Sequence, residues 1–296
     1  CSYQWFVDHE LTPQRLEPEA DPLWLGSVVH DALQRLYAEA PGSDSIPRPG
    51  DVGAWKRRLA ELIDEVAEAS DTPVSAERRL GLARLGIQLE GFLDAEAASE
   101  TVLRPRPELL EVGFGFDEGG EGAAELELGD DFALRGRIDR IDVEPGGTRA
   151  LLRDYKTSGK VPGATGMAKE GKLQLQLYML AARDRLGLDP VGGLYQPLGA
   201  YGDKRPRGIV LRSECDEPGV LHGLDISKRG DAVAKEPFDD ALDDALELAR
   251  ANGRRMLAGD IRRDPLGGVC STYCTFQAIC RLERAVGLGE EREVEE

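Results

Sequence analysis

The spacing of apolar residues changes along the chain, and this change limits the folds that the chain can adopt. From Trp24 to Ala40, apolar residues recur at the 3.6-residue period of a helix. Between positions 108 and 157, they alternate with polar residues or fall in runs of β-formers, as in strands. Helical patterns return after position 172. The sequence therefore predicts an α/β protein in which helices flank a mixed central β-sheet.

The same patterns predict individual elements and three parts of the chain. Helices are expected at 24–40, 52–69, 75–98, 172–186 and 237–258, with Asp51 capping the second. Strands are expected at 108–116, 123–128, 132–143, 149–157, 193–198 and 207–212. We expect a helical N-terminal part at 1–105, a sheet core at 106–260, and a C-terminal cysteine loop with an acidic tail at 261–296, within one integrated domain of 1–286.

Composition excludes some classes of function. The 296-residue chain carries a net charge of −18, which is unlike the basic surface of a general nucleic-acid coat protein. Such a charge is compatible with a metal-dependent enzyme, because metal sites gather carboxylates. No apolar run approaches the roughly 20 residues that cross a bilayer, and no secretory leader opens the chain, so we expect a cytoplasmic protein without a membrane partner. The chain has no phosphate-binding loop for ATP.

Two acidic residues and a lysine form the first candidate site. Asp139 lies in one predicted strand, and Asp154 and Lys156 share a face of the next, roughly 7 Å apart. If these strands are neighbours, the three side chains converge. Carboxylates suit Mg²⁺ or Mn²⁺, and the lysine could orient a water or stabilise a phosphorane-like transition state. Taken alone, the pattern also fits solvated strand faces.

The surrounding motifs favour a catalytic metal site over solvated strand faces. Gly136-Arg-Ile-Asp-Arg-Ile-Asp142, Asp154-Tyr-Lys-Thr-Ser-Gly-Lys160 and Gln174-Leu-Gln-Leu-Tyr178 closely resemble the RecB-like branch of the PD-(D/E)XK nucleases. That branch includes the nuclease domains of AddB-type helicase–nuclease subunits. The resemblance covers the chain from Cys1 to Arg281 and implies a restriction-endonuclease-like core.

The resemblance also implies roles for individual residues. Asp139 and Asp154 are expected to bind the catalytic metal with the carbonyl of Tyr155, and Lys156 to act with them in hydrolysis. His30, in the segment 26–33, is expected to complete the metal shell.

Further residues are implied more loosely. Gln174 and Tyr178, on one helix face, are expected beside the active site and the DNA. Glu111 could reach the metal or lie exposed on its strand. The basic residues that could touch phosphates are Arg137, Arg140, Lys160, Lys169, Lys172, Lys204, Arg205 and Arg207.

The cysteines form a second candidate site. Cys270, Cys274 and Cys280 lie close together, and soft thiolates bind zinc or an iron–sulfur cluster. With Cys1 as the fourth ligand, they resemble the [4Fe–4S] pattern of the same nucleases, in which the cluster joins the two chain ends. The three residues between Cys270 and Cys274, where many relatives have two, depart from that pattern. Cys215 fits no ligand pattern, and we expect it in packing or at the surface.

The resemblance implies a metal-dependent deoxyribonuclease, of exonuclease type on single-stranded DNA, used in recombination and repair. Because Cys1 begins directly in an amphipathic run, we expect a fragment of a longer helicase–nuclease, with a helicase domain or subunit as partner. Alternatives within the class are a stand-alone nuclease and a CRISPR-adaptation-type nuclease. Alternatives outside it are a non-catalytic DNA-binding or scaffold domain and an electron-transfer protein.

Overall fold

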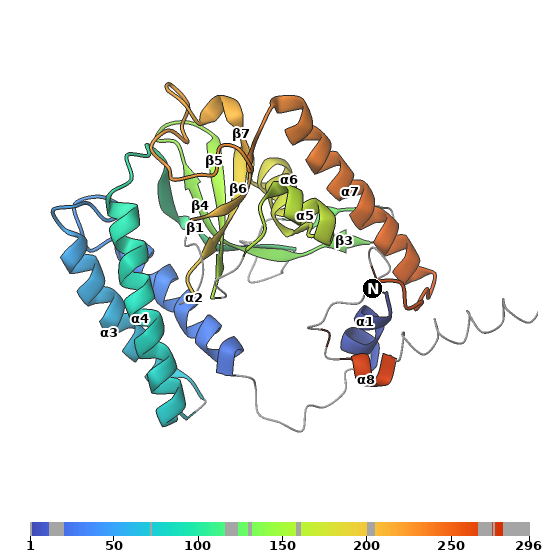
Figure 1. Ribbon diagram of the computed structural model, residues 1–296, viewed down its shortest axis with the longest axis horizontal. Coiled ribbons are helices and arrows are strands. Elements are labelled where there is room, and N and C mark those ends of the chain that lie inside the picture. The colour runs from blue at the N-terminus through green and yellow to red at the C-terminus, as the bar shows by residue number, and fades with distance from the viewer. Residues whose placement is uncertain are drawn as a thin grey trace, which may run out of the picture. The chain divides into compact units, whose positions relative to one another are not determined.

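Most strands of the larger part of the chain form one mixed sheet (Figure 1). The computed structural model describes residues 2–11, 21–71, 73–115, 124–129, 132–157, 161–199, 205–265, 274 and 276–280. They fall into two units, one of residues 19–246 and one that combines residues 1–18 with 247–296.

The sheet of the first unit has six strands in the order β1-β4-β5-β6-β7-β8. Neighbours are antiparallel except for the parallel pairs β5–β6 and β7–β8. This architecture confirms the predicted mixed sheet. The strands are β1 (Arg104–Phe114), β4 (Gly136–Val143), β5 (Arg149–Lys156), β6 (Asp189–Pro197), β7 (Arg207–Leu211) and β8 (Ala232–Val233), and a separate pair is formed by β2 (Leu126–Glu127) and β3 (Ala133–Leu134).

Helices flank the sheet on both sides (Figure 1). One side carries α2 (Asp21–Glu39), α3 (Val52–Ala69) and α4 (Ala76–Ala97), and the other carries α5 (Ala164–Glu170) and α6 (Gln174–Leu186). The helix α7 (Lys235–Leu257) follows the last strand. The second unit contains α1 (Ser2–Phe6), a π-helical turn (Val7–Leu11) and α8 (Gln277–Cys280). Among the described helices, none has a stretch long and apolar enough to cross a membrane.

Some local expectations were wrong for identifiable reasons. The helix α5, which begins after Gly163 and ends before Gly171, was not predicted. Asp51 stands just before α3, but its carboxylate makes no helix cap. It accepts hydrogen bonds from Ser43 and from the backbone of Arg48 instead, and so it stabilises the preceding loop.

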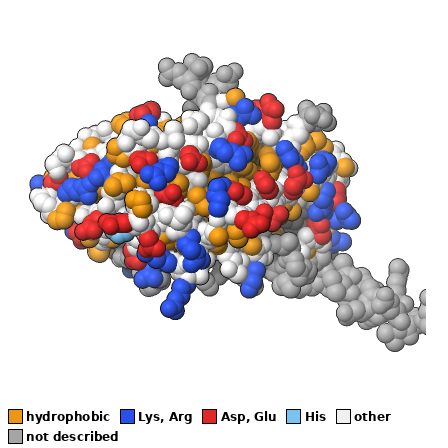
Figure 2. All heavy atoms as spheres, turned by 90° about the horizontal axis from the view of Figure 1, so that it is seen from above, with side chains coloured by type: hydrophobic (Ala, Val, Ile, Leu, Met, Phe, Trp, Pro, Cys, Tyr) orange, Lys and Arg blue, Asp and Glu red, His pale blue; other side chains and the backbone are white. Residues whose placement is uncertain are grey.

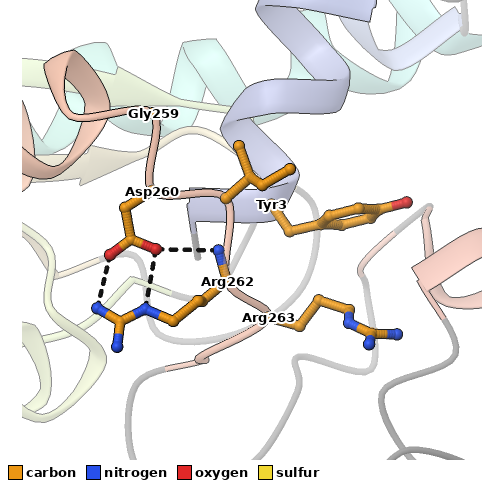
Figure 3. Close-up of a pocket in the computed structure, with 6 residues that line it drawn as sticks. Tyr3, Gly259, Asp260, Arg262 and Arg263 are labelled. Atoms are coloured by element: carbon orange, nitrogen blue, oxygen red, sulfur yellow. Dashed lines mark hydrogen bonds and ion pairs between the residues drawn. The ribbon is translucent and has the colours of Figure 1, made fainter.

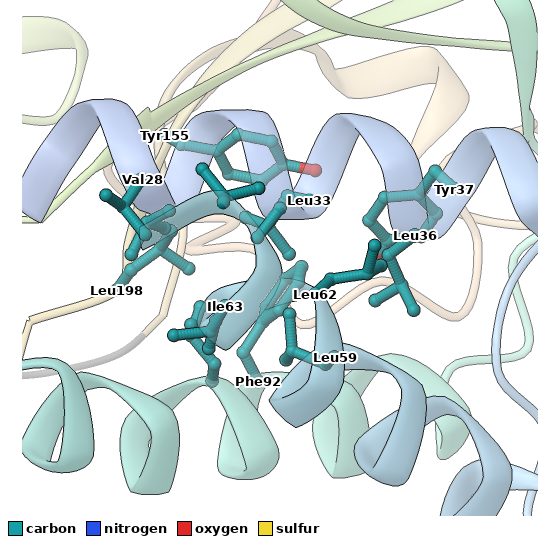
Figure 4. Packing of buried hydrophobic residues seen from close by; sticks show 14 of the residues in the cluster. Val28, Leu33, Leu36, Tyr37, Leu59, Leu62, Ile63, Phe92, Tyr155 and Leu198 are labelled. Carbon is teal, nitrogen blue, oxygen red and sulfur yellow. The ribbon is translucent and has the colours of Figure 1, made fainter. Parts of the chain in front are cut away.

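The hydrophobic core lies between the sheet and the helices α2, α3 and α4. Apolar side chains of these helices, such as Leu33, Leu62 and Phe92, meet Tyr155 of β5 and Leu198 (Figure 4). All are buried, and the spacing of apolar residues along α2 and α3 explains why these helices turn the same face inward. The core therefore fixes α2 against the strands that carry the candidate acids.

A buried network of ion pairs lies beside this core. Asp142 of β4 accepts hydrogen bonds from Arg140 Nε (2.5 Å) and Arg153 Nε (2.7 Å). Arg140 also pairs with Glu96 of α4 (2.8 Å) and lies over the ring of Tyr37 of α2, 4.1 Å from its centroid. The Arg140 side chain is only 1% exposed, so this residue is not one of the basic residues that could touch phosphates. The network links two strands to two helices.

Burial makes an ionised side chain less stable, and in this network the opposite charges of neighbouring side chains offset that cost. Burial alone would raise the pKa of the Asp142 carboxyl, but Arg140 and Arg153 hold it below its ordinary value. Removing one member of such a set leaves an uncompensated buried charge, which is strongly destabilising.

We predict that Asp142→Asn lowers the free energy of unfolding by about 3–5 kcal/mol, because it strands Arg140 and Arg153 without their shared anion. Urea unfolding followed by circular dichroism measures this. Asp239→Asn breaks an exposed pair with Lys235 and is the matched control, expected to cost less than about 1 kcal/mol. Equal midpoints for the two variants would contradict the prediction.

Candidate metal and catalytic centre

The two candidate aspartates lie where β4 and β5 separate. These strands pair as antiparallel neighbours from Arg140 with Arg153 onward. Beyond that pair, the backbone N–H of Tyr155 donates to Asp139 Oδ2 at 2.6 Å. The carboxylates of Asp139 and Asp154 are 11% and 3% exposed. The carboxylate of Asp139 thus takes the place of a backbone carbonyl as the acceptor for Tyr155, and this hydrogen bond holds Asp139 against β5.

Lys156 extends the site along β5. Its Nζ lies 2.5 Å from Asp154 Oδ2 and donates to Gln174 Oε1 at 3.2 Å. Gln174 Nε2 in turn donates to the Tyr178 hydroxyl at 3.2 Å. The predicted pair on α6 therefore adjoins the lysine. Gly136 leaves room for the rings of Phe114 and Tyr178, since a Cβ there would lie 2.7 Å from the first and 3.1 Å from the second.

His30 and Glu111 close the other side of the site. His30 Nδ1, on α2, lies 3.3 Å from Glu111 Oε1 and 3.6 Å from Asp139 Oδ1. The imidazole also meets the Tyr155 ring edge-on, at 5.9 Å between centroids. Glu111 faces into the site, which answers the question that its strand position left open.

The backbone of Glu111 is unusual. Its φ is +49°, in the left-handed region that residues other than glycine rarely adopt. The pairing of β1 with β4 shifts register just before it, between Pro105 and Leu110. Such strain costs about 1–3 kcal/mol and persists where the surrounding structure imposes it.

The donor set fits a divalent cation. One ligand atom each from His30, Glu111 and Asp139 lies within 4.8 Å of the others. Asp154 Oδ2 is buried and, apart from its ion pair with Lys156, has no hydrogen-bond partner among the described residues. An imidazole and carboxylates are suitable ligands for Mn²⁺, and carboxylates for Mg²⁺.

The acids of this site repel one another when no cation is bound. Burial raises the pKa of the Asp139 carboxyl to about 7, with Asp154 and Glu111 contributing against the opposing charge of His30. Burial also raises the pKa of Asp154, although Lys156 opposes it. For His30, burial lowers the pKa, but Glu111 and Asp139 more than reverse this and raise it.

The shift at Asp139 predicts a pH-dependent stability. The ordinary pKa of this carboxyl is 3.8, so as the pH rises the unfolded chain releases the proton before the folded chain does. The folded state therefore loses stability as the pH rises from 3.8 to about 7. In EDTA, Asp139→Asn should therefore raise the melting temperature, by roughly 2–10 °C at pH 8 and by less at pH 5. Differential scanning calorimetry measures both. Added Mn²⁺ should stabilise the parent protein more than the variant. If Asp139→Asn raises the melting temperature equally at pH 5 and pH 8, the raised pKa of Asp139 is contradicted.

The second candidate site falls largely outside the described residues. Cys1 and Cys270 lie outside them. Lys160 and Lys204, two of the candidate phosphate contacts, also lie outside the described residues. Cys274 is half-buried, and Cys280 and Cys215 are buried. Cys215 Sγ donates to the Leu211 carbonyl at 3.4 Å, which agrees with a packing role.

Tyr3 and the segment 259–263 form a hollow in the second unit (Figure 3). The hollow measures about 600 Å³. Asp260 accepts hydrogen bonds from Arg255 and Arg262, and Arg263 Nη1 donates to the Cys280 carbonyl at 2.7 Å. Its lining residues are Tyr3, Gly259, Asp260, Ile261, Arg262 and Arg263. Tyr3 and the segment after α7 therefore face the same hollow.

Basic side chains show no one-sided arrangement on the surface in view. On the face drawn in Figure 2, acidic and basic side chains of the described residues are interspersed. Arg205 pairs with Asp225, and Arg207 pairs with the buried Asp231. Lys172 pairs with Glu170. Several of the predicted phosphate contacts thus already have acidic partners.

The similarity of the chain to known proteins identifies its family. Residues 1–281 match the family described as the PD-(D/E)XK nuclease superfamily. The chain is 22% identical to an ATP-dependent helicase/deoxyribonuclease subunit of Alkaliphilus metalliredigens, over 96% of this chain and 29% of that protein. It is likewise 22% identical to the exonuclease/helicase subunit RexB of Lactococcus lactis, over 98% of this chain and 28% of that protein. The chain thus spans less than a third of the length of these relatives.

A family match over nearly the whole chain, together with a mixed sheet that carries acids and a lysine at one site, defines the class. The chain belongs to the PD-(D/E)XK nuclease superfamily.

Proposed function

We propose that this chain is a metal-dependent deoxyribonuclease whose centre is formed by Asp139, Asp154 and Lys156. The observation that carries the proposal is the convergence of these side chains with His30 where β4 and β5 separate. The names of the relatives, which include deoxyribonuclease and exonuclease, support DNA as the substrate.

Each residue has a role that follows from its contacts. Asp139, Asp154, His30 and Glu111 would hold a Mg²⁺ or Mn²⁺ ion, with the Tyr155 carbonyl as a further ligand. When bound, the ion polarises a phosphoryl oxygen and lowers the pKa of a water.

Lys156 adds a fixed positive charge at the side of the site facing α6. Its Nζ can donate to the attacking water or to the phosphate oxygen that gains charge. Gln174 orients the lysine through its Oε1, and Tyr178 orients Gln174.

The experiment is cleavage of end-labelled single-stranded DNA with Mg²⁺ or Mn²⁺. Asp154→Asn and Lys156→Ala should each lower the rate by at least about 100-fold, because each removes a charge that acts on the transition state. The matched controls are Asp216→Asn and Lys228→Ala, which break an exposed ion pair of similar length, 2.6 Å. Cleavage by the site variants at the parent rate would contradict the proposal and favour a non-catalytic DNA-binding domain.

The finer parts of the proposal concern mode and setting. We infer exonuclease-type action on single strands, within a helicase–nuclease that serves recombination and repair. The match to about the same fraction of several helicase/deoxyribonuclease proteins supports this setting. A helicase region encoded upstream of Cys1 would support this larger machine, whereas a start codon directly before Cys1 would support a stand-alone or CRISPR-adaptation-type nuclease.

We also propose that Cys1, Cys270, Cys274 and Cys280 bind a [4Fe–4S] cluster, with zinc as the alternative. The supporting observations are that both ends of the chain belong to one unit, and that Tyr3, near Cys1, lines the same hollow as Arg263, which contacts Cys280. A link between distant chain ends would also stabilise the fold by restricting the unfolded chain.

Purified under nitrogen, the protein should be brown and contain about four iron and four sulfide per chain. Cys280→Ser should lose both, since one of the thiolate ligands is gone, while Cys215→Ser should keep both. Colourless protein containing zinc would overturn the cluster in favour of a zinc site. Iron retained in full by Cys280→Ser would contradict the ligand assignment.

A further inference from the structure

One aromatic ring lies against the lysine of the proposed centre. Tyr195, on β6, is the direct partner of Asp154 in the parallel pairing of β5 and β6. The Lys156 ammonium lies over its ring, 5.3 Å from the centroid. This is within the roughly 6 Å over which an aromatic face attracts a cation. Tyr195 is 2% exposed, whereas the side chain of Lys156 is 35% exposed, so the lysine meets the buried ring on one side and solvent on another.

The other contacts of Lys156 show what the ring adds. A lysine ammonium has three N–H donors. One points toward Asp154 Oδ2 at 2.5 Å and one toward Gln174 Oε1 at 3.2 Å. The ring attracts the charge through its quadrupole and need not accept a conventional hydrogen bond. A third donor therefore remains for a water or a phosphate oxygen.

The hydroxyl of Tyr195 contributes little to this arrangement. Among the described residues, it has no hydrogen-bond partner, whereas the Tyr178 hydroxyl nearby accepts from Gln174. The ring face, not the phenol oxygen, is the part of Tyr195 that acts on the lysine.

We propose that Tyr195 is a positioning residue whose ring holds the Lys156 ammonium above β6 and leaves one N–H free for the reaction. The inference rests on the proposed nuclease function. Sequence patterns give no sign of this role, since a buried aromatic residue on a strand is ordinary core.

Kinetics of single-stranded DNA cleavage with Mn²⁺ tests the role. Tyr195→Leu should lower kcat by about 3- to 30-fold with little change in KM, because only the transition-state contact of Lys156 is loosened. Tyr195→Phe keeps the ring and should stay within about twofold of the parent. Phe238→Leu shortens an equally buried aromatic residue of α7 and controls for lost packing.

A double-mutant cycle separates positioning from packing. In a Lys156→Ala background, Tyr195→Leu should cause no further loss, since the group that the ring positions is absent. An equal loss in both backgrounds would overturn the inference and make Tyr195 a structural residue.

A second readout does not depend on cleavage. In NMR spectra of protein labelled at lysine, the Lys156 ε-protons should be shifted upfield by the ring in the parent and in Tyr195→Phe, and should move downfield in Tyr195→Leu. Ordinary shifts in the parent would overturn the contact itself. If Lys156→Ala leaves cleavage unchanged, the proposed function fails, whereas ordinary NMR shifts beside an inactive Lys156→Ala reject only the role of Tyr195.

Discussion

The buried carboxylate of Asp142, shared by Arg140 and Arg153, is the interaction on which the rest of the structure depends. Through Arg140 it reaches Glu96 of α4 and Tyr37 of α2. A buried charge tolerates little displacement, because any movement exposes it to an uncompensated desolvation cost. The network therefore holds β4, β5, α2 and α4 in one arrangement, and these elements include the three that carry His30, Asp139 and Asp154.

Tyr155 transmits this arrangement to the site. Its ring packs in the core against Phe92 and meets His30 edge-on, and its hydroxyl lies 3.5 Å from Arg140. Its backbone N–H holds Asp139. One residue thus connects the apolar core, the ionic network and the candidate metal ligands. Gathering the acids costs free energy, as the raised pKa of Asp139 and the strained backbone of Glu111 indicate.

Much of the fold and the centre could be predicted from local patterns. Alternation along β5 places Asp154 and Lys156 on one face, and the helical spacing of Gln174 and Tyr178 places them together on α6. Other features could not be predicted. Arg140 looks like any solvent-facing strand cation, because only the approach of α2 and α4 buries it. The side chain of Glu111 points into the site just after a register shift between β1 and β4, and the residue types around it do not predict that shift.

The sequence by itself determined the class of fold, the superfamily and the residues proposed to carry its chemistry, because periodicity and motif spacing are local properties of the chain. Only the tertiary structure decided which of these residues meet. The N–H of Tyr155 turns to Asp139, His30 arrives from a helix more than 80 residues before Glu111, and Tyr195 comes to lie against Lys156 through a parallel strand pair. Such contacts depend on long-range packing and charge burial, which emerge only when distant segments share one interior.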